Sequence, residues 1–287
     1  LLKFSDNSGF CIFENLNSSL KKRGPDHTSV EFVQGNLMLH NLLDISGHFR
    51  TQPVYYKNSY LLYNGELYND LRGNSCDTDL ILPLYHEQGL SFVRDLDGEY
   101  SFLILDLNTN MCHLFSDRFS TKPIYYSLER GLTVSSLTSP FTFLGLRDYE
   151  RVEPSTIVSV NLLTFELERT DYSCFELSDS SEDVGIFFKA LEESVSKRVR
   201  DRGDLFLGLS SGYDSGVLLQ VMLNLGVGFE VFSLFSEKED HNILEYRLSL
   251  CESHGIPVNR IFLSDSERVF LKLLVKRGED FDYRHIK

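Results

Sequence analysis

The feature that most restricts the fold of this chain is the segment at residues 207–215, Leu-Gly-Leu-Ser-Ser-Gly-Tyr-Asp-Ser. A run at 204–209 that reads as a buried strand breaks into small residues, and a helical pattern follows. Such a break between a strand and a helix is how a parallel sheet presents backbone N–H groups to an anion. The segment predicts a pyrophosphate-binding loop in a parallel α/β domain.

The loop differs from the other common nucleotide-binding signatures. No lysine lies between residues 203 and 234, so the P-loop of kinases and GTPases is excluded, and the dinucleotide pattern Gly-x-Gly-x-x-Gly also fails. Hydroxyls of Ser210 and Ser215 and amides around Gly212 can donate to phosphate oxygens, whereas Asp214 would repel them unless a cation lay between. We therefore expect a nucleotide with Mg²⁺, held partly by Asp214. The alternative is a turn in which serine and glycine only cap a helix.

Length, charge and cysteine content narrow the class of protein. The 287 residues allow two domains, and the net charge of −14 argues against nucleic acid or an anionic membrane as a partner. No apolar run approaches the roughly 18 residues of a membrane span, and no signal-peptide pattern opens the chain, so we expect a cytoplasmic location. Five scattered cysteines without a Cys-x-x-Cys pair predict buried free thiols.

The two halves of the chain have different hydrophobic patterns. Between residues 28 and 168, short apolar runs separated by turn residues predict strands, with helical spacing only near 12–20 and 77–89. Strands are expected near 37–42, 60–63, 101–105, 112–115, 123–126, 132–135 and 156–160.

The second half alternates helix and strand after a polar linker at 178–183. Ser180 and Asp183 are a candidate capping box for its first helix. This alternation predicts a doubly wound parallel sheet whose ligand lies at the carboxyl ends of the strands. The predicted elements are a helix from 184, a strand at 204–209, a helix at 215–225, a strand at 229–234, a helix at 243–254 and a strand at 259–263.

Polar residues in the first half form a second candidate site. Arg23 could clamp a carboxylate, while Glu66 and Asp77 could hold an ammonium group. The Asn64 side chain and the Gly65 amide could form a two-donor oxyanion hole. Together they describe a pocket for an α-amino acid attacked at a side-chain carbonyl. Taken singly, each residue also has an ordinary use, as a helix stop, a hairpin turn or an N-cap.

The order of these motifs resembles the glutamine-hydrolysing asparagine synthetases, in which a class II glutaminase domain precedes an ATP-pyrophosphatase domain. The resemblance covers nearly the whole chain. It is carried by Arg-Gly-Pro-Asp at 23–26, Asn-Gly-Glu-Leu-Tyr-Asn at 64–69, Cys-Asp-Thr-Asp at 76–79, Leu-Asp-Gly-Glu-Tyr-Ser-Phe at 96–102, Asp-Arg-Phe-Ser-Thr-Lys-Pro-Ile-Tyr-Tyr at 117–126 and Ser-Ser-Gly-Tyr-Asp-Ser-Gly at 210–216.

The resemblance implies two domains with different folds and ligands. Residues 1–177 would form an α+β N-terminal nucleophile domain, an αββα sandwich, that hydrolyses glutamine, with Arg23, Glu66 and Asp77 binding it. Residues 178–287 would form a shortened α/β PP-loop ATP-pyrophosphatase domain that adenylates aspartate or another carboxylate for attack by ammonia. Its ATP site would comprise Ser210, Ser211, Gly212, Asp214, Ser215 and, beside the adenine, Leu234. The resemblance also leaves a homodimer as one possible assembly.

The chain departs from the family's pattern at three places. In the family, a cysteine at the mature N-terminus is the nucleophile and its own α-amine is the base. Here the chain starts at Leu1, and Cys11 has neither a free amine nor a candidate histidine, so either some residues are absent or the glutaminase is inactive. The family's later Ser-Gly-Glu-Gly-Ala-Asp-Glu element is not found. Ser211, Tyr213 and Gly216 replace the loop's glycine, leucine and serine, which leaves the acceptor substrate open.

Three functional hypotheses follow from these observations. The leading one is an amide-forming enzyme of the asparagine synthetase type. The second is a non-catalytic relative that keeps the fold for binding or regulation, and the third is a divergent tailoring enzyme that acts on a carboxylate other than aspartate.

Overall fold

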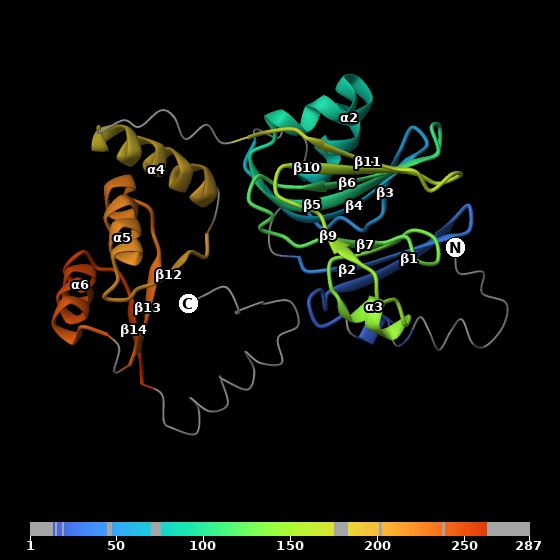
Figure 1. Cartoon of the computed structure of the whole chain (residues 1–287). Helices are drawn as coiled ribbons and strands as arrows, with labels where there is room; N and C mark the ends of the chain where they lie inside the picture. Colours follow the sequence, from blue (N-terminus) through green and yellow to red (C-terminus); the bar gives the residue numbers. More distant parts are fainter. Residues whose placement is uncertain are drawn as a thin grey trace. The chain divides into compact units, whose positions relative to one another are not determined.

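A computed structural model describes residues 14, 16–18, 20–44, 48–69, 76–174, 183–200, 203–236 and 239–262 of the chain. The chain divides into two compact units, the first ending at Phe175 and the second beginning at Glu176 (Figure 1). Cys11 and most of the predicted linker lie outside the described residues, as does Ser180 of the predicted capping box.

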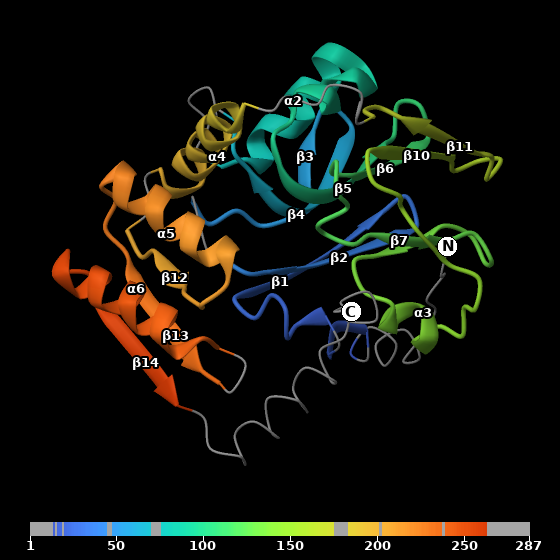
Figure 2. The same cartoon turned by 60° about the vertical axis from the view of Figure 1, so that its left-hand side comes forward.

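An antiparallel six-stranded sheet is the largest element of the first unit (Figures 1 and 2). Its central pairing is nine residues long on each strand and joins the segment that carries Asn64 to the one that carries Tyr100. The strand order is β11 (Leu167–Asp171), β10 (Thr156–Asn161), β6 (Met111–Ser116), β5 (Gly98–Asp106), β4 (Ser59–Leu67) and β3 (Val54–Tyr56).

Two smaller sheets form a second β layer. One is the hairpin of β1 (His27–Val33) and β2 (Asn36–Leu42), and the other has the order β8 (Thr133–Ser135), β7 (Tyr125–Ser127), β9 (Glu150–Arg151). Val33 and Met38 of the hairpin pack against Leu105 of β5. Ile124 and Tyr126, around β7, pack against strands β6 and β10. The two layers therefore share apolar cores, as a β sandwich requires.

Helices lie outside the two β layers. Helix α2 (Thr78–Gln88) continues into the 3₁₀ helix η1 (Gly89–Asp95), and the buried faces of both pack on the six-stranded sheet. The short helix α3 (Ser139–Phe143) lies on the opposite side of the strands from α2 (Figure 1). The predicted αββα layering is therefore confirmed for the described part of the first unit.

A buried carboxylate, Asp117, joins three segments of the first unit. Its Oδ2 accepts hydrogen bonds from the amides of Tyr100 and Thr121, at 3.0 Å each. Its Oδ1 accepts from the Phe119 amide at 2.8 Å and from the Thr121 hydroxyl at 3.1 Å. The Asp117 backbone pairs with Tyr100 and also accepts from the Ser155 amide. Because a buried polar group is tolerated only when it is hydrogen-bonded, these donors make the Asp117 carboxyl group part of the structure of the first unit.

We expect Asp117→Asn to destabilise the first unit by about 3 kcal/mol, because a carboxamide can accept at only one atom and its NH₂ group would face the amide donors. The midpoint of urea unfolding, followed by tyrosine fluorescence, measures the loss. Asp148→Asn changes an exposed carboxylate in the same unit and should leave the midpoint unchanged. Equal midpoints for the two variants would contradict the role given to Asp117.

His113 is a second buried polar group, and it should make stability depend on pH. Burial lowers the pKa of His113 to about 4, and its Nδ1 lies 2.8 Å from the Ser159 hydroxyl. An unfolded chain takes up this proton near pH 6.5, whereas the folded protein takes it up only near pH 4. Acidification through this window therefore favours the unfolded state.

Between pH 7 and pH 5, we expect the free energy of unfolding of His113→Gln to fall by about 1–2 kcal/mol less than that of wild type, because the variant has no imidazole to titrate. Urea unfolding at several pH values measures this slope. Ser159→Ala should keep the wild-type slope, since it removes the hydrogen bond but leaves the imidazole buried. If His113→Gln and wild type had parallel pH profiles, His113 would not be the titrating group.

The second unit contains a parallel sheet, as the alternation predicted. Its strands are β12 (Phe206–Gly208), β13 (Glu230–Phe235) and β14 (Val258–Phe262), in that order, and both pairings are parallel. The helices are α4 (Val184–Val199), α5 (Tyr213–Leu225) and α6 (His241–Ser253). Residues from all three helices and from the strands share one hydrophobic core.

Only one face of this sheet is covered in the described residues, which differs from the doubly wound prediction. Along β13, Val231, Ser233 and Phe235 are buried while the alternate residues are exposed. The order of the strands in the sheet is their order in the sequence, so both crossovers run in the same direction across the sheet. Right-handed crossovers that run in one direction place α5 and α6 on the same face of the sheet. Two faces are covered only where the strand order reverses.

Several predicted boundaries are wrong by a few residues. Helix α5 begins at Tyr213 rather than at 215, with Gly212 as its N-cap, because the loop tightens directly into the helix. Helix α6 begins at His241, where the Asp240 side chain accepts from two backbone amides. Asp183 is itself the N-cap of α4 and accepts from the Gly185 amide, so the predicted capping box, in which Asp183 would be the third helical residue after an N-cap at Ser180, is wrong.

The sequence pattern missed several elements of the first unit. Strand β1 has an exposed residue at most positions, so it lacks the alternation that marks a half-buried strand. Strands β3 and β9 have three and two residues, too few to show a period. Of the helices that the structure describes, none combines the length and apolar character needed to cross a membrane.

Candidate functional site

The predicted oxyanion residues lie inside strand β4 and not in a turn after it. Asn64 and Gly65 pair with Ser101 and Tyr100 of β5, so the hairpin-turn alternative is wrong. Gly65 has a φ of +154°, and a Cβ there would lie 2.2 Å from the Glu99 carbonyl oxygen. The close approach of the two backbones therefore requires glycine. The Asn64 side chain is exposed, which leaves its amide accessible to a ligand.

Asp77 is held against the end of β4 by contacts through both carboxylate oxygens. Its Oδ2 accepts from the Tyr63 hydroxyl at 2.9 Å and from the Leu67 amide at 3.3 Å. Its Oδ1 accepts from the Thr78 amide at 2.8 Å, which caps α2. Burial, followed by the neighbouring Asp77 charge, raises the pKa of Tyr63 well above its usual value, so the phenol stays a donor. The alternative interpretation of Asp77 as an N-cap is therefore confirmed. The same carboxylate also lies beside β4, the strand that carries Glu66.

Arg23 lies in the turn before β1. Its amide donates to the Leu20 carbonyl at 3.0 Å, which ends the preceding helical turn as predicted. A Cβ on Gly24 would lie 2.1 Å from the Asn41 carbonyl oxygen, so the motif's glycine is required for close packing on β2. Asp26 accepts from the Asp44 amide at 2.8 Å. This motif therefore has a structural role, whereas the predicted contact of Arg23 with a ligand stays a prediction.

Two residues near this site were missed by the sequence analysis. Arg50 forms an ion pair with Asp79 at 3.1 Å, in the first turn of α2 and two residues from Asp77. The buried Gln52 side chain forms two hydrogen bonds with the Tyr63 backbone, of 2.6 and 3.1 Å. Neither belongs to a local pattern, because each partner is distant in the sequence.

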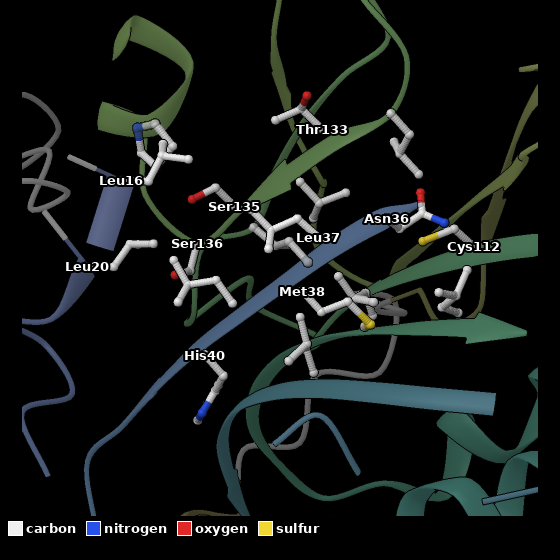
Figure 3. Close-up of a pocket in the computed structure, with 18 of the residues that line it drawn as sticks. Leu16, Leu20, Asn36, Leu37, Met38, His40, Cys112, Thr133, Ser135 and Ser136 are labelled. Carbon is white, nitrogen blue, oxygen red and sulfur yellow. The ribbon is translucent and has the colours of Figure 1, made fainter. Parts of the chain in front are cut away.

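A cavity of about 320 Å³ opens between the two β layers (Figure 3). Asn64 and Ser101 line it from the six-stranded sheet, and Met38 and His40 line it from β2. Burial lowers the pKa of His40 to about 4, so this imidazole is neutral at pH 7. The remaining lining is mainly apolar, including Leu16, Leu20, Leu37 and Cys112. Asn64 therefore lies at the edge of a largely apolar space.

The predicted phosphate loop of the second unit lies between β12 and α5, at the carboxyl end of the sheet. The Ser210 and Ser215 hydroxyls lie 2.9 Å apart, and the Ser210 amide donates to the Ser215 hydroxyl at 3.1 Å. The Gly212 amide donates to the Ser210 hydroxyl at 3.2 Å. The structure therefore brings Ser210, Gly212 and Ser215 together, as the loop pattern predicted.

Ser211 has an acidic partner that the sequence did not indicate. Its amide and its hydroxyl both donate to one oxygen of Glu239, at 2.6 Å each. These hydrogen bonds lower the pKa of Glu239 below its usual value. The Ser211 amide and hydroxyl therefore both donate to a carboxylate of the same unit.

The remaining predicted ligands of the nucleotide are exposed. Asp214 lies in the first turn of α5, and Leu234 lies on the uncovered face of β13, 44% exposed. Ser233, its buried neighbour, donates to the Leu209 carbonyl at 2.8 Å and ties β13 to the start of the loop. Within the described residues, no three His, Cys, Asp or Glu side chains are grouped to hold a metal.

The described cysteines are free thiols, as predicted. Cys112 and Cys251 are buried, whereas Cys76 is half-buried and Cys174 is exposed, so the prediction that all are buried is wrong for two of them. Burial raises the pKa of Cys112 to about 12, which makes this thiol unreactive.

Comparison with known families assigns the first unit. A model of the glutamine amidotransferase domain matches residues 2–176, which is more than half of the chain. The chain belongs to the glutamine amidotransferase domain family.

Relatives named as asparagine synthetases are longer than this chain. A protein named as a glutamine-hydrolysing asparagine synthetase in Methanocaldococcus jannaschii is 36% identical over 272 residues, covering 83% of this chain and 49% of the relative. Asparagine synthetase 2 of Lotus japonicus is 27% identical over 229 residues, covering 72% and 38%. The chain thus spans about half the length, or less, of these relatives.

A solved structure is also similar. The glutamine phosphoribosylpyrophosphate amidotransferase from B. subtilis, complexed with ADP and GMP, is 17% identical, with a TM-score of 0.40, and covers 84% of this chain and 56% of its own.

We expect Gly65→Ala to destabilise this amidotransferase domain by about 2–4 kcal/mol, because the added Cβ would overlap the backbone of β5. Urea unfolding measures the change. Gly145→Ala is a matched control, since Gly145 also has a positive φ but has no atom within 4 Å of the added Cβ. If both variants lost the same free energy of unfolding, the effect would come from the positive φ alone and not from the close contact between the backbones of β4 and β5.

Proposed function

We propose that the chain is the glutaminase and part of the synthetase of a glutamine-dependent, ATP-consuming amide-forming enzyme. The observation that carries this proposal is the end of strand β4, where Asn64 and Gly65 adjoin Glu66 and the firmly held carboxylate of Asp77. This arrangement brings donors for an oxyanion, on β4, together with acceptors for an ammonium group, one on β4 and one at the N-cap of α2. The similarity to named asparagine synthetases supports aspartate, or another carboxylate, as the acceptor.

Each residue of the first unit would have a separate role in glutamine hydrolysis. Glu66 and Asp77 would accept hydrogen bonds from the α-ammonium group, and Arg23 would pair with the α-carboxylate. The Asn64 carboxamide and the Gly65 amide would donate to the side-chain carbonyl oxygen as negative charge develops on it. Because Tyr63 and the Leu67 amide fix Asp77, the ammonium ligand needs little reorganisation when glutamine binds.

The second unit would bind the nucleotide at the carboxyl end of its parallel sheet. Ser210, Ser211, Gly212 and Ser215 would donate to the phosphates, and Asp214 would hold Mg²⁺, which commonly uses one or two carboxylates together with phosphate oxygens. Leu234 would lie beside the adenine. When bound, ATP supplies the adenylation that makes an unreactive carboxylate electrophilic.

We expect the chain to bind L-glutamine in isothermal titration calorimetry, and Glu66→Gln and Asp77→Asn each to weaken binding at least about tenfold, because each removes a charge from the ammonium site. Glu87→Gln is the matched control, since Glu87 is an exposed carboxylate on the same helix as Thr78. If injecting glutamine into the wild-type chain gave no more heat than injecting buffer, the glutaminase proposal would be rejected and a non-catalytic relative favoured.

Asn64→Ala separates catalysis from binding. We expect it to lower kcat for glutamate release by about 100-fold with little change in KM, because the lost donor stabilises charge that develops only in the transition state. A parallel rise in KM would instead place Asn64 in ground-state binding. Pyrophosphate release from ATP, screened over carboxylates with added ammonia, then identifies the acceptor, and a preference for another carboxylate would reject aspartate.

A further inference from the structure

Arg247, on helix α6, contacts the back of the proposed phosphate loop. Its Nη1 donates to the carbonyl oxygens of Ser210, at 2.6 Å, and Gly212, at 2.7 Å. The side chain is half-buried, so water competes only partly for these hydrogen bonds. One guanidinium nitrogen thus bridges two carbonyl groups of the loop, and each bond is assisted by the positive charge.

Gly216 provides the space that this arginine occupies. A Cβ at position 216 would lie 2.4 Å from Arg247 Nη2 and 2.6 Å from Cζ. Any other residue at this position would therefore displace the guanidinium. Gly216 has no positive φ, and a glycine inside a helix costs stability relative to alanine. The local conformation does not require glycine here, whereas the position of Arg247 does.

The planarity of the peptide bond links these carbonyl contacts to the loop amides. In a trans peptide, the C=O of one residue and the N–H of the next point in opposite directions. Holding the Ser210 and Gly212 oxygens toward Arg247 therefore directs the Ser211 and Tyr213 amides to the other side. The Ser211 amide does point to an anion there, the carboxylate of Glu239.

We propose that Arg247 is a positioning residue for pyrophosphate binding, and that Gly216 is present to admit it. Arg247 does not touch the nucleotide; it fixes the direction in which the loop amides face. The proposal rests on the proposed function of the loop as a nucleotide site. It also accounts for the departure of Gly216 from the related loop, because a serine there would overlap the guanidinium.

The test is MgATP binding to the full chain, measured by calorimetry for wild type, Arg247→Ala, Arg247→Lys and Gly216→Ala. We expect Arg247→Ala and Gly216→Ala to raise Kd at least about tenfold, and Arg247→Lys to restore part of the affinity. Gly216→Ala should leave the unfolding midpoint unchanged or raise it, because alanine favours the helix. Weakened binding in a protein of undiminished stability cannot come from general unfolding.

The double variant Gly216→Ala/Arg247→Ala tests whether the two residues act through one contact. It should bind MgATP as Arg247→Ala does, since the alanine has no guanidinium left to displace. Arg260→Ala is the matched control, because Arg260 is also a partly exposed arginine, but its ion pairs are with Glu245 and Glu252 of α6. Additive losses in the double variant, or wild-type affinity in Arg247→Ala, would overturn the proposal.

Hydrogen exchange without nucleotide distinguishes this inference from the proposed function. We expect faster exchange of the peptide covering 209–216 in Arg247→Ala than in wild type and Arg260→Ala. If wild type does not bind MgATP, the nucleotide function fails, and the exchange rates still show whether Arg247 orders the loop. Unchanged exchange in Arg247→Ala would overturn the positioning role whatever the ligand.

Discussion

The buried Asp117 carboxylate is the interaction on which the first unit depends. It accepts from the Tyr100 amide and from the loop that leads to β7, so it connects the central sheet to the second β layer. Tyr100 pairs with Gly65, whose backbone lies too close to β5 for any other residue. This carboxylate thus holds the β5 segment that pairs with the part of β4 carrying Asn64, Gly65 and Glu66.

The second unit uses charge in a comparable way. Arg247 draws two loop carbonyls to one side, and Glu239 accepts from a loop amide on the other. Charged groups distant in sequence thereby contact both the carbonyl and the amide groups of the loop. In both units a charged side chain thus holds a segment that contains residues proposed to bind ligand.

Much of the fold could be predicted from the sequence, because its longer elements have clear periods. The alternation after residue 183 predicted the parallel sheet, and the expected beginning of α4 at residue 184 and end of α2 at Gly89 are confirmed. Strand β1 was missed because its residues are exposed in no regular order. Asn64 and Gly65 are also typical of a turn, but they lie in a strand because they pair with β5. This pairing joins residues distant in the sequence, so no local pattern predicts it.

The sequence by itself indicated the order of the two units, the position of the loop at 210–215 between a strand and a helix, and the family of the first unit, since these depend on residue types at close spacing. Only the tertiary structure decided which of those residues are held and by what. Arg50 meets Asp79 across 29 positions, and Arg247 meets Ser210 across 37. Such contacts arise when strands and helices pack, and the spacing of residues along the chain contains no record of them.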